Sequence, residues 1–211
     1  MENLIGHSIT VFLAFFAVMN PISNAAVFVG LTGDENRATR QQIARQSVLM
    51  AFGIILFFCI LGNAIFELFG ISLPAFRITG GVLIFLVGFH MLQGRSSKLH
   101  HPQAQAKSSE SADGANVAIS PLAIPILAGP GTIATAMNYS ATGSHAQSAI
   151  TIAAFSVLCI VTYLAFISGE RLIHVLGQSG MDIVTRLMGL ILAVVGTQML
   201  IDGIHDAAKH Y

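Results

Sequence analysis

Two prolines lie near the middle of long apolar segments, each beside residues that suit ligand binding. The first is in Asn20-Pro21-Ile22 (the Asn-Pro motif) and the second in Gly129-Pro130-Gly131 (the Gly-Pro-Gly motif). Proline lacks a backbone donor and its ring clashes with the preceding turn, so each segment should form two half-helices. A half-helix that starts there offers N–H groups to an anion, and one that ends there offers carbonyl oxygens to a cation. Together, the two motifs suit a small zwitterion.

Polar side chains surround both prolines. Asn20, Ser23 and Asn24 flank the first, and Thr132 and Thr135 follow the second. They form hydrogen bonds at a lower desolvation cost than a charge, and the glycines of the second motif leave room for a small ligand. Alternatively, these groups only bond to helix carbonyls or join helices, and this stays open for Ser23, Thr132 and Thr135. The candidate substrate-binding residues are Asn20, Pro21, Ser23, Asn24, Gly129, Pro130, Gly131 and Thr132.

The elements that must position these residues are membrane helices. The chain has 211 residues, of which 54% are hydrophobic and 9% charged, and its mean hydropathy is +0.74. A soluble domain carries about 25% charged residues, and a membrane-spanning helix needs about 20 mainly apolar ones. Six segments meet this requirement: 8–30, 47–69, 76–92, 117–139, 149–167 and 183–201. The sequence therefore predicts an all-α integral membrane protein with six transmembrane helices.

The positive charges of the loops predict the orientation of the chain. Loops after the first, third and fifth segments, with the adjoining turns, contain most of the Lys and Arg residues, namely Arg37, Arg40, Arg45, Arg95, Lys98, Lys107, Arg171 and Arg186. The other side has only Arg77 and Lys209. Because the positive side is usually cytoplasmic, both termini should be periplasmic in a bacterial inner membrane. Arg77 and Arg186, at helix starts, are expected to anchor at the headgroups.

The two halves of the sequence repeat at a fixed offset. Pro21 matches Pro130 and Arg77 matches Arg186, since 130 − 21 and 186 − 77 both give 109. Gly80 with Gly189 and Gly94 with Gly203 have the same separation, although matching of glycines by chance is an alternative. Three helices per repeat require opposite orientations, a common plan in secondary transporters. The predicted division is a first repeat at 1–94, a flexible cytoplasmic linker at 95–116 and a second repeat at 117–211.

Other chemistries have little support in the sequence. The formal net charge is zero, so no basic face favours nucleic acid, and no HExxH, GxSxG or intramembrane aspartate pair supports an enzyme. His100-His101 in the linker is more simply an inert polar pair than a metal site, so no metal or cofactor is expected. No Asp, Glu or Lys is central in a segment, and Glu67 and His90 lie near segment ends. The coupling ion, H⁺ or Na⁺, is therefore left open, as is homo-oligomer formation.

Several motifs resemble those of one family. Asn20-Pro21-Ile22, Phe69-Gly70-Ile71-Ser72, Arg77-Ile78-Thr79-Gly80-Gly81, Pro121-Leu122-Ala123-Ile124-Pro125, Ala128-Gly129-Pro130-Gly131-Thr132-Ile133 and Arg186-Leu187-Met188-Gly189 resemble the MarC family. The resemblance implies a six-helix inner-membrane protein and, for members of the SnatA type, transport of small neutral amino acids such as glycine and alanine. Ser23 and Ala26 stand where many members have glycine and proline.

The leading hypothesis is a secondary transporter of small neutral amino acids, acting as an exporter. The substrate carboxylate would bind the N–H groups of one half-helix, and its ammonium the carbonyls and Asn20. One alternative is an exporter of drugs or other metabolites, which should have a large aromatic cavity or a buried carboxylate. Another is a passive channel or a non-transporting membrane subunit, which should have rings of charge or a hydrophobic gate.

Overall fold

The computed structural model describes residues 2–94, 127–141 and 145–209, and no strand occurs in these ranges. The helices are α1 (Glu2–Met19), α2 (Pro21–Leu31), α3 (Arg37–Phe69), α4 (Leu73–Leu92), α7 (Pro130–Ala141), α8 (His145–Ile167) and α9 (Gly169–Lys209). The predicted linker at 95–116, with its histidine pair, lies outside the described residues.

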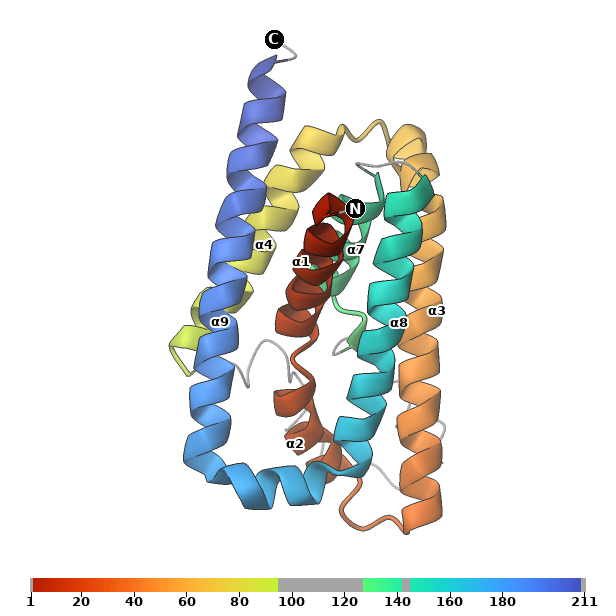
Figure 1. The fold of residues 1–211 in the computed structure, drawn as a ribbon, viewed down its shortest axis with the longest axis vertical. Coiled ribbons are helices and arrows are strands. Elements are labelled where there is room, and N and C mark those ends of the chain that lie inside the picture. The colour runs from red at the N-terminus through yellow and green to blue at the C-terminus, as the bar shows by residue number, and fades with distance from the viewer. Residues whose placement is uncertain (1, 95–126, 142–144, 210–211) are drawn as a thin grey trace.

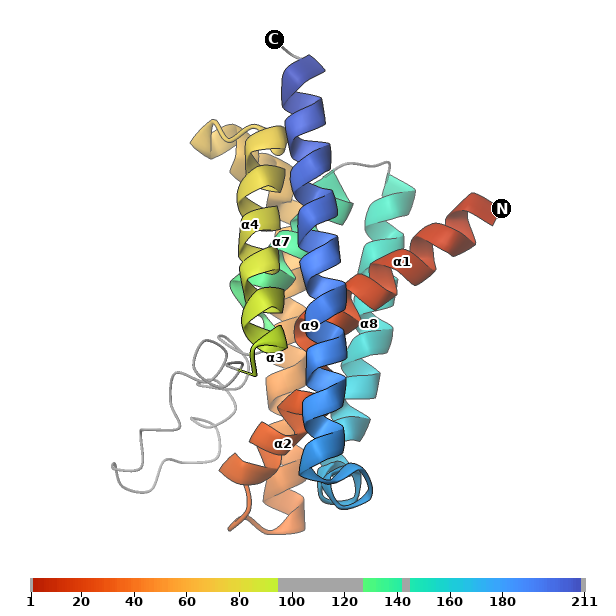
Figure 2. The same cartoon turned by 90° about the vertical axis from the view of Figure 1, so that its left-hand side faces the viewer.

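The helices form an elongated bundle around α1, α2 and α7 (Figure 1). In the view of Figure 1, α4 and α9 run antiparallel on one side, and α3 and α8 run antiparallel on the other. Helix α1 begins and α9 ends in the same half of the bundle, and Figure 2 shows α1 leaning outwards from the centre. The start of α3, the end of α8 and the start of α9 lie at the opposite end.

Five helical segments of the described chain are long and apolar enough to cross a membrane. They are Gly6–Leu31, Arg37–Gly62, Leu73–Leu92, Ala146–Ile167 and Ser179–Lys209. Large apolar side chains such as Ile60 (67% exposed) and Val194 (61% exposed) cover their outer faces, which suits contact with lipid. Of the remaining predicted segment, 117–139, only the part from Leu127 onward is described, and it includes most of α7. The prediction of an all-α, multi-pass membrane protein is thus confirmed, but a sixth span is not established.

Two helices extend well beyond the predicted apolar segments. Helix α3 starts at Arg37 rather than at residue 47, because the Asn36 side chain caps it by accepting a hydrogen bond from the Thr39 N–H at 2.9 Å. Helix α9 starts at Gly169 rather than at 183, with a kink at Gly177, where φ is 61° and ψ is 175°. The predicted segments are apolar runs and not whole helices, so the helices are longer. The apolar span within α9, Ser179–Lys209, begins close to the predicted residue 183, whereas that within α3, Arg37–Gly62, begins earlier than predicted.

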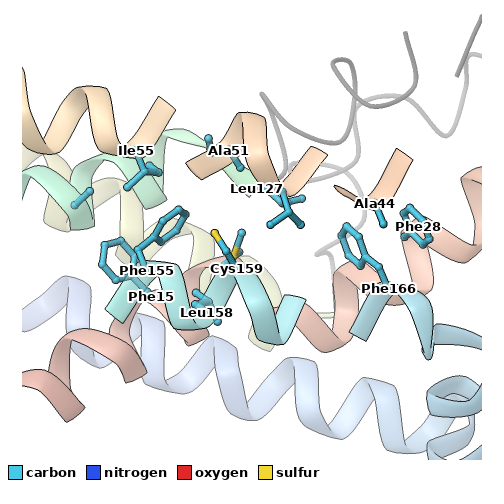
Figure 3. Close-up of a cluster of buried hydrophobic side chains, with 14 of the residues drawn as sticks. Phe15, Phe28, Ala44, Ala51, Ile55, Leu127, Phe155, Leu158, Cys159 and Phe166 are labelled. Atoms are coloured by element: carbon cyan, nitrogen blue, oxygen red, sulfur yellow. The ribbon is translucent and has the colours of Figure 1, made fainter. Parts of the chain in front are cut away.

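An aromatic core joins α8 to both α1 and α2. Phe155 packs against Phe15 of α1 with ring centroids 5.0 Å apart, and Phe166 stacks on Phe28 of α2 at 4.5 Å. Figure 3 shows these four rings with Ile55 and Leu158 in the same buried cluster. Because the pairs lie on either side of Asn20 in the sequence, α8 fixes the positions of the two helices that meet there.

Helices α4 and α9 contact each other through glycine backbones. A Cβ atom added to Gly88 would lie 2.5 Å from the Gly189 carbonyl oxygen, and one added to Gly81 would lie 2.7 Å from that of Gly196. Such distances leave no space for a side chain, so these glycines allow close helix packing. The pair α4 and α9 therefore forms a rigid wall beside the central helices.

Candidate functional site

Asn20 separates α1 from α2 in the Asn-Pro motif. Its backbone is left-handed, with φ 42° and ψ 70°, and it is the one non-glycine residue with positive φ in the described chain. Asparagine tolerates this conformation better than most residues because its short polar side chain bonds locally. The Asn20 Oδ1 accepts a hydrogen bond from the Ser23 N–H at 3.3 Å, and Pro21 occupies the first position of α2. The motif therefore ends α1 and starts α2 within a single residue.

Asn24 closes the same junction from the other side. Its Nδ2 donates to the Met19 carbonyl oxygen at 2.5 Å, and its backbone N–H donates to the Asn20 carbonyl oxygen at 3.0 Å. The side chain is buried, at 4% exposure. Asn24 thus satisfies the last carbonyl of α1, a structural role, and its amide nitrogen is already engaged.

The amide NH₂ group of the Asn20 side chain has no acceptor among the described residues. The residue is 5% exposed, and its Nδ2 is buried without a hydrogen-bond partner in the described part of the chain. Burying an unpaired polar group costs about 1–3 kcal/mol. The amide nitrogen of Asn20 is consequently a donor available to an acceptor group on a bound molecule.

The Gly-Pro-Gly motif begins α7. Gly129 is buried, Pro130 is exposed at the first helical position, and the Ile133 N–H donates to the Gly129 carbonyl oxygen at 3.0 Å. The amides of Gly131 and Thr132 precede this bond, so by position they have no acceptor within the helix. This start of α7 therefore presents two backbone donors and little side-chain bulk.

The two threonines after this motif differ in what the structure shows. Thr135 is 1% exposed, and its hydroxyl donates to the Gly131 carbonyl oxygen at 2.8 Å, so it bonds within its own helix. Thr132 is also 1% exposed. For Thr135, the structure therefore supports the alternative that the hydroxyl only bonds to a carbonyl of its own helix. Thr132 stays a candidate substrate-binding residue.

The last turn of α1 lies against the first turn of α7. A Cβ atom added to Gly131 would lie 3.3 Å from Cγ1 of Val18. Val18 and Ala17 also share a buried cluster with Ala134 of α7. From this region α2 and α7 run in opposite directions along the bundle (Figure 1). The structure thus brings the two predicted motifs together near the centre, although Ser23 is only half-buried and Pro130 faces outwards.

The other end of α7 carries polar contacts that the sequence did not indicate. Arg77 of α4 forms an ion pair with Asp206 of α9, and its Nε donates to Oδ1 of Asn138 at 3.0 Å. The expected role of Arg77 as a headgroup anchor is thus incomplete, because it joins α4, α7 and α9. Opposite charges at the same end of the third and last segments were the available signal. Glu67 is exposed, and Nδ1 of the half-buried His90 lies 2.6 Å from the Leu86 carbonyl oxygen of its own helix.

The described cavities lie away from the two motifs. One of about 440 Å³ is at the start of α3, and one of about 560 Å³ is between α3 and α8. Neither is lined by a candidate substrate-binding residue. Among the described residues, no group of three or more His, Cys, Asp or Glu side chains is arranged to hold a metal ion.

Comparison with known proteins gives a match over nearly the whole chain. The family described as MarC family integral membrane protein matches residues 5–208. The UPF0056 membrane protein YvbG of Bacillus subtilis is 42% identical over 199 residues, covering 90% of each chain. A UPF0056 membrane protein of Methanocaldococcus jannaschii is 35% identical over 201 residues, covering 94% of this chain and 96% of the relative. The UPF0056 inner membrane protein MarC of Escherichia coli is 32% identical over 201 residues, covering 91% of each. No solved structure matches significantly.

Proposed function

The chain belongs to the MarC family of integral membrane proteins, and we propose that it is a secondary transporter of small neutral amino acids such as glycine and alanine. It acts as an exporter in the bacterial inner membrane, the location given in the name of the E. coli relative. The observation that carries this proposal is the buried, unpartnered amide nitrogen of Asn20, which is two residues after Val18, the α1 residue that faces Gly131 at the start of α7.

The substrate carboxylate binds the donors in this region. These are the Asn20 Nδ2 and the backbone amides of Gly131 and Thr132, at the start of α7, where the helix dipole also favours an anion. The sequence hypothesis paired Asn20 with the ammonium group. Because the Asn20 Oδ1 already accepts from Ser23, the side chain offers a donor, and we assign it to the carboxylate.

The substrate ammonium binds carbonyl oxygens at the end of α1. In a continuous helix the Ala17 carbonyl would accept from residue 21, but Pro21 has no N–H. The Met19 carbonyl is occupied by Asn24, so the carbonyls of Ala17 and Val18 remain, and we assign the ammonium to that of Ala17, which loses its helix donor at Pro21. A zwitterion is held in this way without a charged side chain, consistent with the absence of Asp, Glu and Lys from α1, apart from Glu2, and from α2 and α7.

Close packing limits the substrate to a small side chain. The 3.3 Å separation between a Cβ on Gly131 and Val18 leaves little space beside the backbone donors. Asn20, Asn24 and Thr132 are all at most 5% exposed. Bulky amino acids would have to displace this packing, so selectivity is steric.

Movement of two inverted halves provides alternating access. Helices α3 and α8, and likewise α4 and α9, are matched by the offset of 109 and run in opposite directions (Figure 1). A Cβ on Gly203 would lie 3.0 Å from the Arg77 Cβ, and one on Gly94, at the matched position, 3.6 Å from Nη2 of the matched Arg186. These paired contacts support an inverted repeat, in which one half rocks against the other with both termini periplasmic.

Transport in proteoliposomes tests the proposal. Labelled glycine and alanine uptake is measured under imposed proton and sodium gradients for the wild type, Asn20→Gly and Asn20→Ala. Asn20→Gly keeps the left-handed backbone without strain and removes the donor, so we expect about 10- to 100-fold weaker substrate binding with nearly normal stability. Asn20→Ala removes the same donor and also places alanine in a strained left-handed backbone, so it should weaken binding and destabilise the protein as well.

The outcomes separate the alternatives. Gradient-dependent uptake that is weakened in Asn20→Gly supports an amino acid transporter with its site at the Asn-Pro motif. Uptake that does not respond to either gradient would indicate a passive channel. If folded wild-type protein takes up neither amino acid, the proposed substrate class is wrong, and an exporter of other metabolites or a non-transporting subunit becomes the better account.

A further inference from the structure

Two hollows follow one another along a single face of α3. The first, of about 440 Å³, includes Arg37 and Gln41, and the second, of about 560 Å³, includes Arg45, Leu49 and Phe52. These positions recur every three or four residues, so they share one side of the helix. The face changes along its length from arginine to apolar side chains, as an amphiphilic ligand would require.

The first hollow is positively charged and lies at the edge of the apolar spans. Arg37 is the first residue of the span Arg37–Gly62, and Ile167 is the last of Ala146–Ile167. Arg40 forms an ion pair with Glu170, whereas its Nε is buried without a hydrogen-bond partner. The lining has three arginines, Arg37, Arg40 and Arg171, and the single carboxylate of Glu170. The hollow therefore has a positive charge excess at the depth of lipid headgroups.

The second hollow is an apolar groove between α3 and α8. Val48 and Cys159 form its buried floor, and Leu49 (56% exposed) and Ile160 (61% exposed) form its walls. The hydroxyl of Ser156 already donates a hydrogen bond to the Ile152 carbonyl oxygen at 2.7 Å, so it needs no hydrogen-bond partner from a molecule in the groove. Helices α3 and α8 are antiparallel (Figure 1), and Arg45 and Tyr163 are the lining residues of the groove nearest in sequence to those of the first hollow.

We propose that the two hollows together form a binding site for an anionic phospholipid. The lipid phosphate lies among the arginines, with Arg45 at the junction of the hollows, and one acyl chain lies in the groove. Charge complementarity selects an anionic over a zwitterionic headgroup, and each basic residue near such a surface contributes to that preference. The continuous change from polar to apolar lining selects a lipid over a free phosphate ion. This site is separate from the proposed transport site and does not depend on it.

Lipid-dependent stability of the purified protein tests this site. The melting temperature in detergent is measured with phosphatidylglycerol, with phosphatidylcholine of the same chains and with inorganic phosphate, and bound lipids are counted by native mass spectrometry. We expect phosphatidylglycerol to raise the melting temperature clearly more than either alternative. Arg45→Gln should weaken its binding about fivefold. Ile160→Trp should block the groove and weaken the binding of the lipid acyl chain.

Matched variants on α9 serve as controls. Arg186→Gln removes another exposed arginine, and Val194→Trp enlarges another exposed apolar side chain (61% exposed), and neither residue lines either hollow. Neither should change the preference for phosphatidylglycerol. Equal stabilisation by the two lipids, equal effects of the α3 or α8 variants and their controls, or full stabilisation by inorganic phosphate alone would overturn the proposal. Ile160→Trp changes an exposed position, so the test remains available if Arg45→Gln does not fold.

Discussion

The Asn-Pro and Gly-Pro-Gly motifs both precede a helix that starts near the centre of the bundle, but they are built differently. At the first, the side chains of Asn20 and Asn24 bond to the Ser23 amide and the Met19 carbonyl, and the backbone of Asn20 is left-handed. At the second, Gly131 leaves its neighbour Val18 in close contact. Side chains shape the first motif, and the lack of side chains shapes the second.

This difference implies a division of roles in the proposed transport site. The Asn-Pro motif supplies a side-chain donor, the Asn20 amide, and Asn24 bonds to the end of α1 beside it, so this motif should be sensitive to changes of chemistry. The Gly-Pro-Gly motif supplies space and backbone amides, so it should be sensitive to changes of volume. Substitutions at each motif can test whether this distinction holds.

The largest effect is expected from Gly131→Val. The added side chain must enter a position where even a Cβ lies 3.3 Å from Val18 Cγ1, so α1 and α7 would move apart. Overpacking of this kind costs about 1–3 kcal/mol, and the displaced amides should no longer bind the substrate. We expect glycine and alanine uptake in proteoliposomes to be lost, and the melting temperature in detergent to fall.

A double mutant makes this prediction specific. Val18→Ala removes the facing methyl groups and should restore part of both stability and uptake in the Gly131→Val background. Gly53→Val is the matched control, because a Cβ added to Gly53 in α3 meets nothing within 4 Å. If Gly53→Val is as damaging as Gly131→Val, helix propensity and not contact with α1 explains the effect.

An intermediate effect is expected from Asn24→Ala. It leaves the buried Met19 carbonyl without its hydrogen bond, which should cost about 1–3 kcal/mol in the free energy of unfolding. Thr135→Val is the corresponding change after the second motif, where the lost bond runs to the Gly131 carbonyl of the same helix. Such a bond within a helix adds little, so Thr135→Val should cost less than about 1 kcal/mol. Unfolding in a titration with sodium dodecyl sulfate compares the two.

Equal losses in these two variants would contradict the distinction between the motifs. A larger loss in Thr135→Val would reverse it and would place the structurally sensitive hydrogen bonds in α7. Uptake measured on the same samples shows whether Asn24 also affects transport beyond its effect on stability.

The sequence predicted the membrane class and the positions of both motifs from simple rules. Long apolar runs indicate lipid-facing helices, and proline indicates a helix start, so α2 and α7 begin at Pro21 and Pro130. Asn20 was singled out because of its position beside Pro21. The left-handed backbone that makes its side chain bond to Ser23 was not predicted, since it depends on local geometry.

Contacts between distant parts of the chain were beyond these rules. The sequence gives no distance between Arg77 and Asp206, which are paired across α4 and α9, nor between Gly131 and Val18. It also could not show that the amide nitrogen of Asn24, a candidate substrate-binding residue, bonds to the Met19 carbonyl oxygen. Polar helix ends were missed at α3 and α9 because hydropathy describes the environment of a segment and not its hydrogen bonding.

The smallest effects are expected from replacing the prolines themselves. Pro130 is exposed at the first position of α7, where its ring makes the unfolded chain less flexible. Pro130→Ala should therefore lower the free energy of unfolding by only about 0.4–1 kcal/mol, because the unfolded chain gains conformational entropy. Pro21 is buried, and Pro21→Ala adds an N–H that would bond to the Ala17 carbonyl, the acceptor assigned to the substrate ammonium, if the helix became continuous there. Both variants should fold, but only Pro21→Ala should reduce uptake.

Hydrogen exchange of the new backbone amide in Pro21→Ala distinguishes the cause. If this amide is protected, it has bonded to α1, whereas rapid exchange of the amide together with reduced uptake would show that the carbonyl is not the ammonium site.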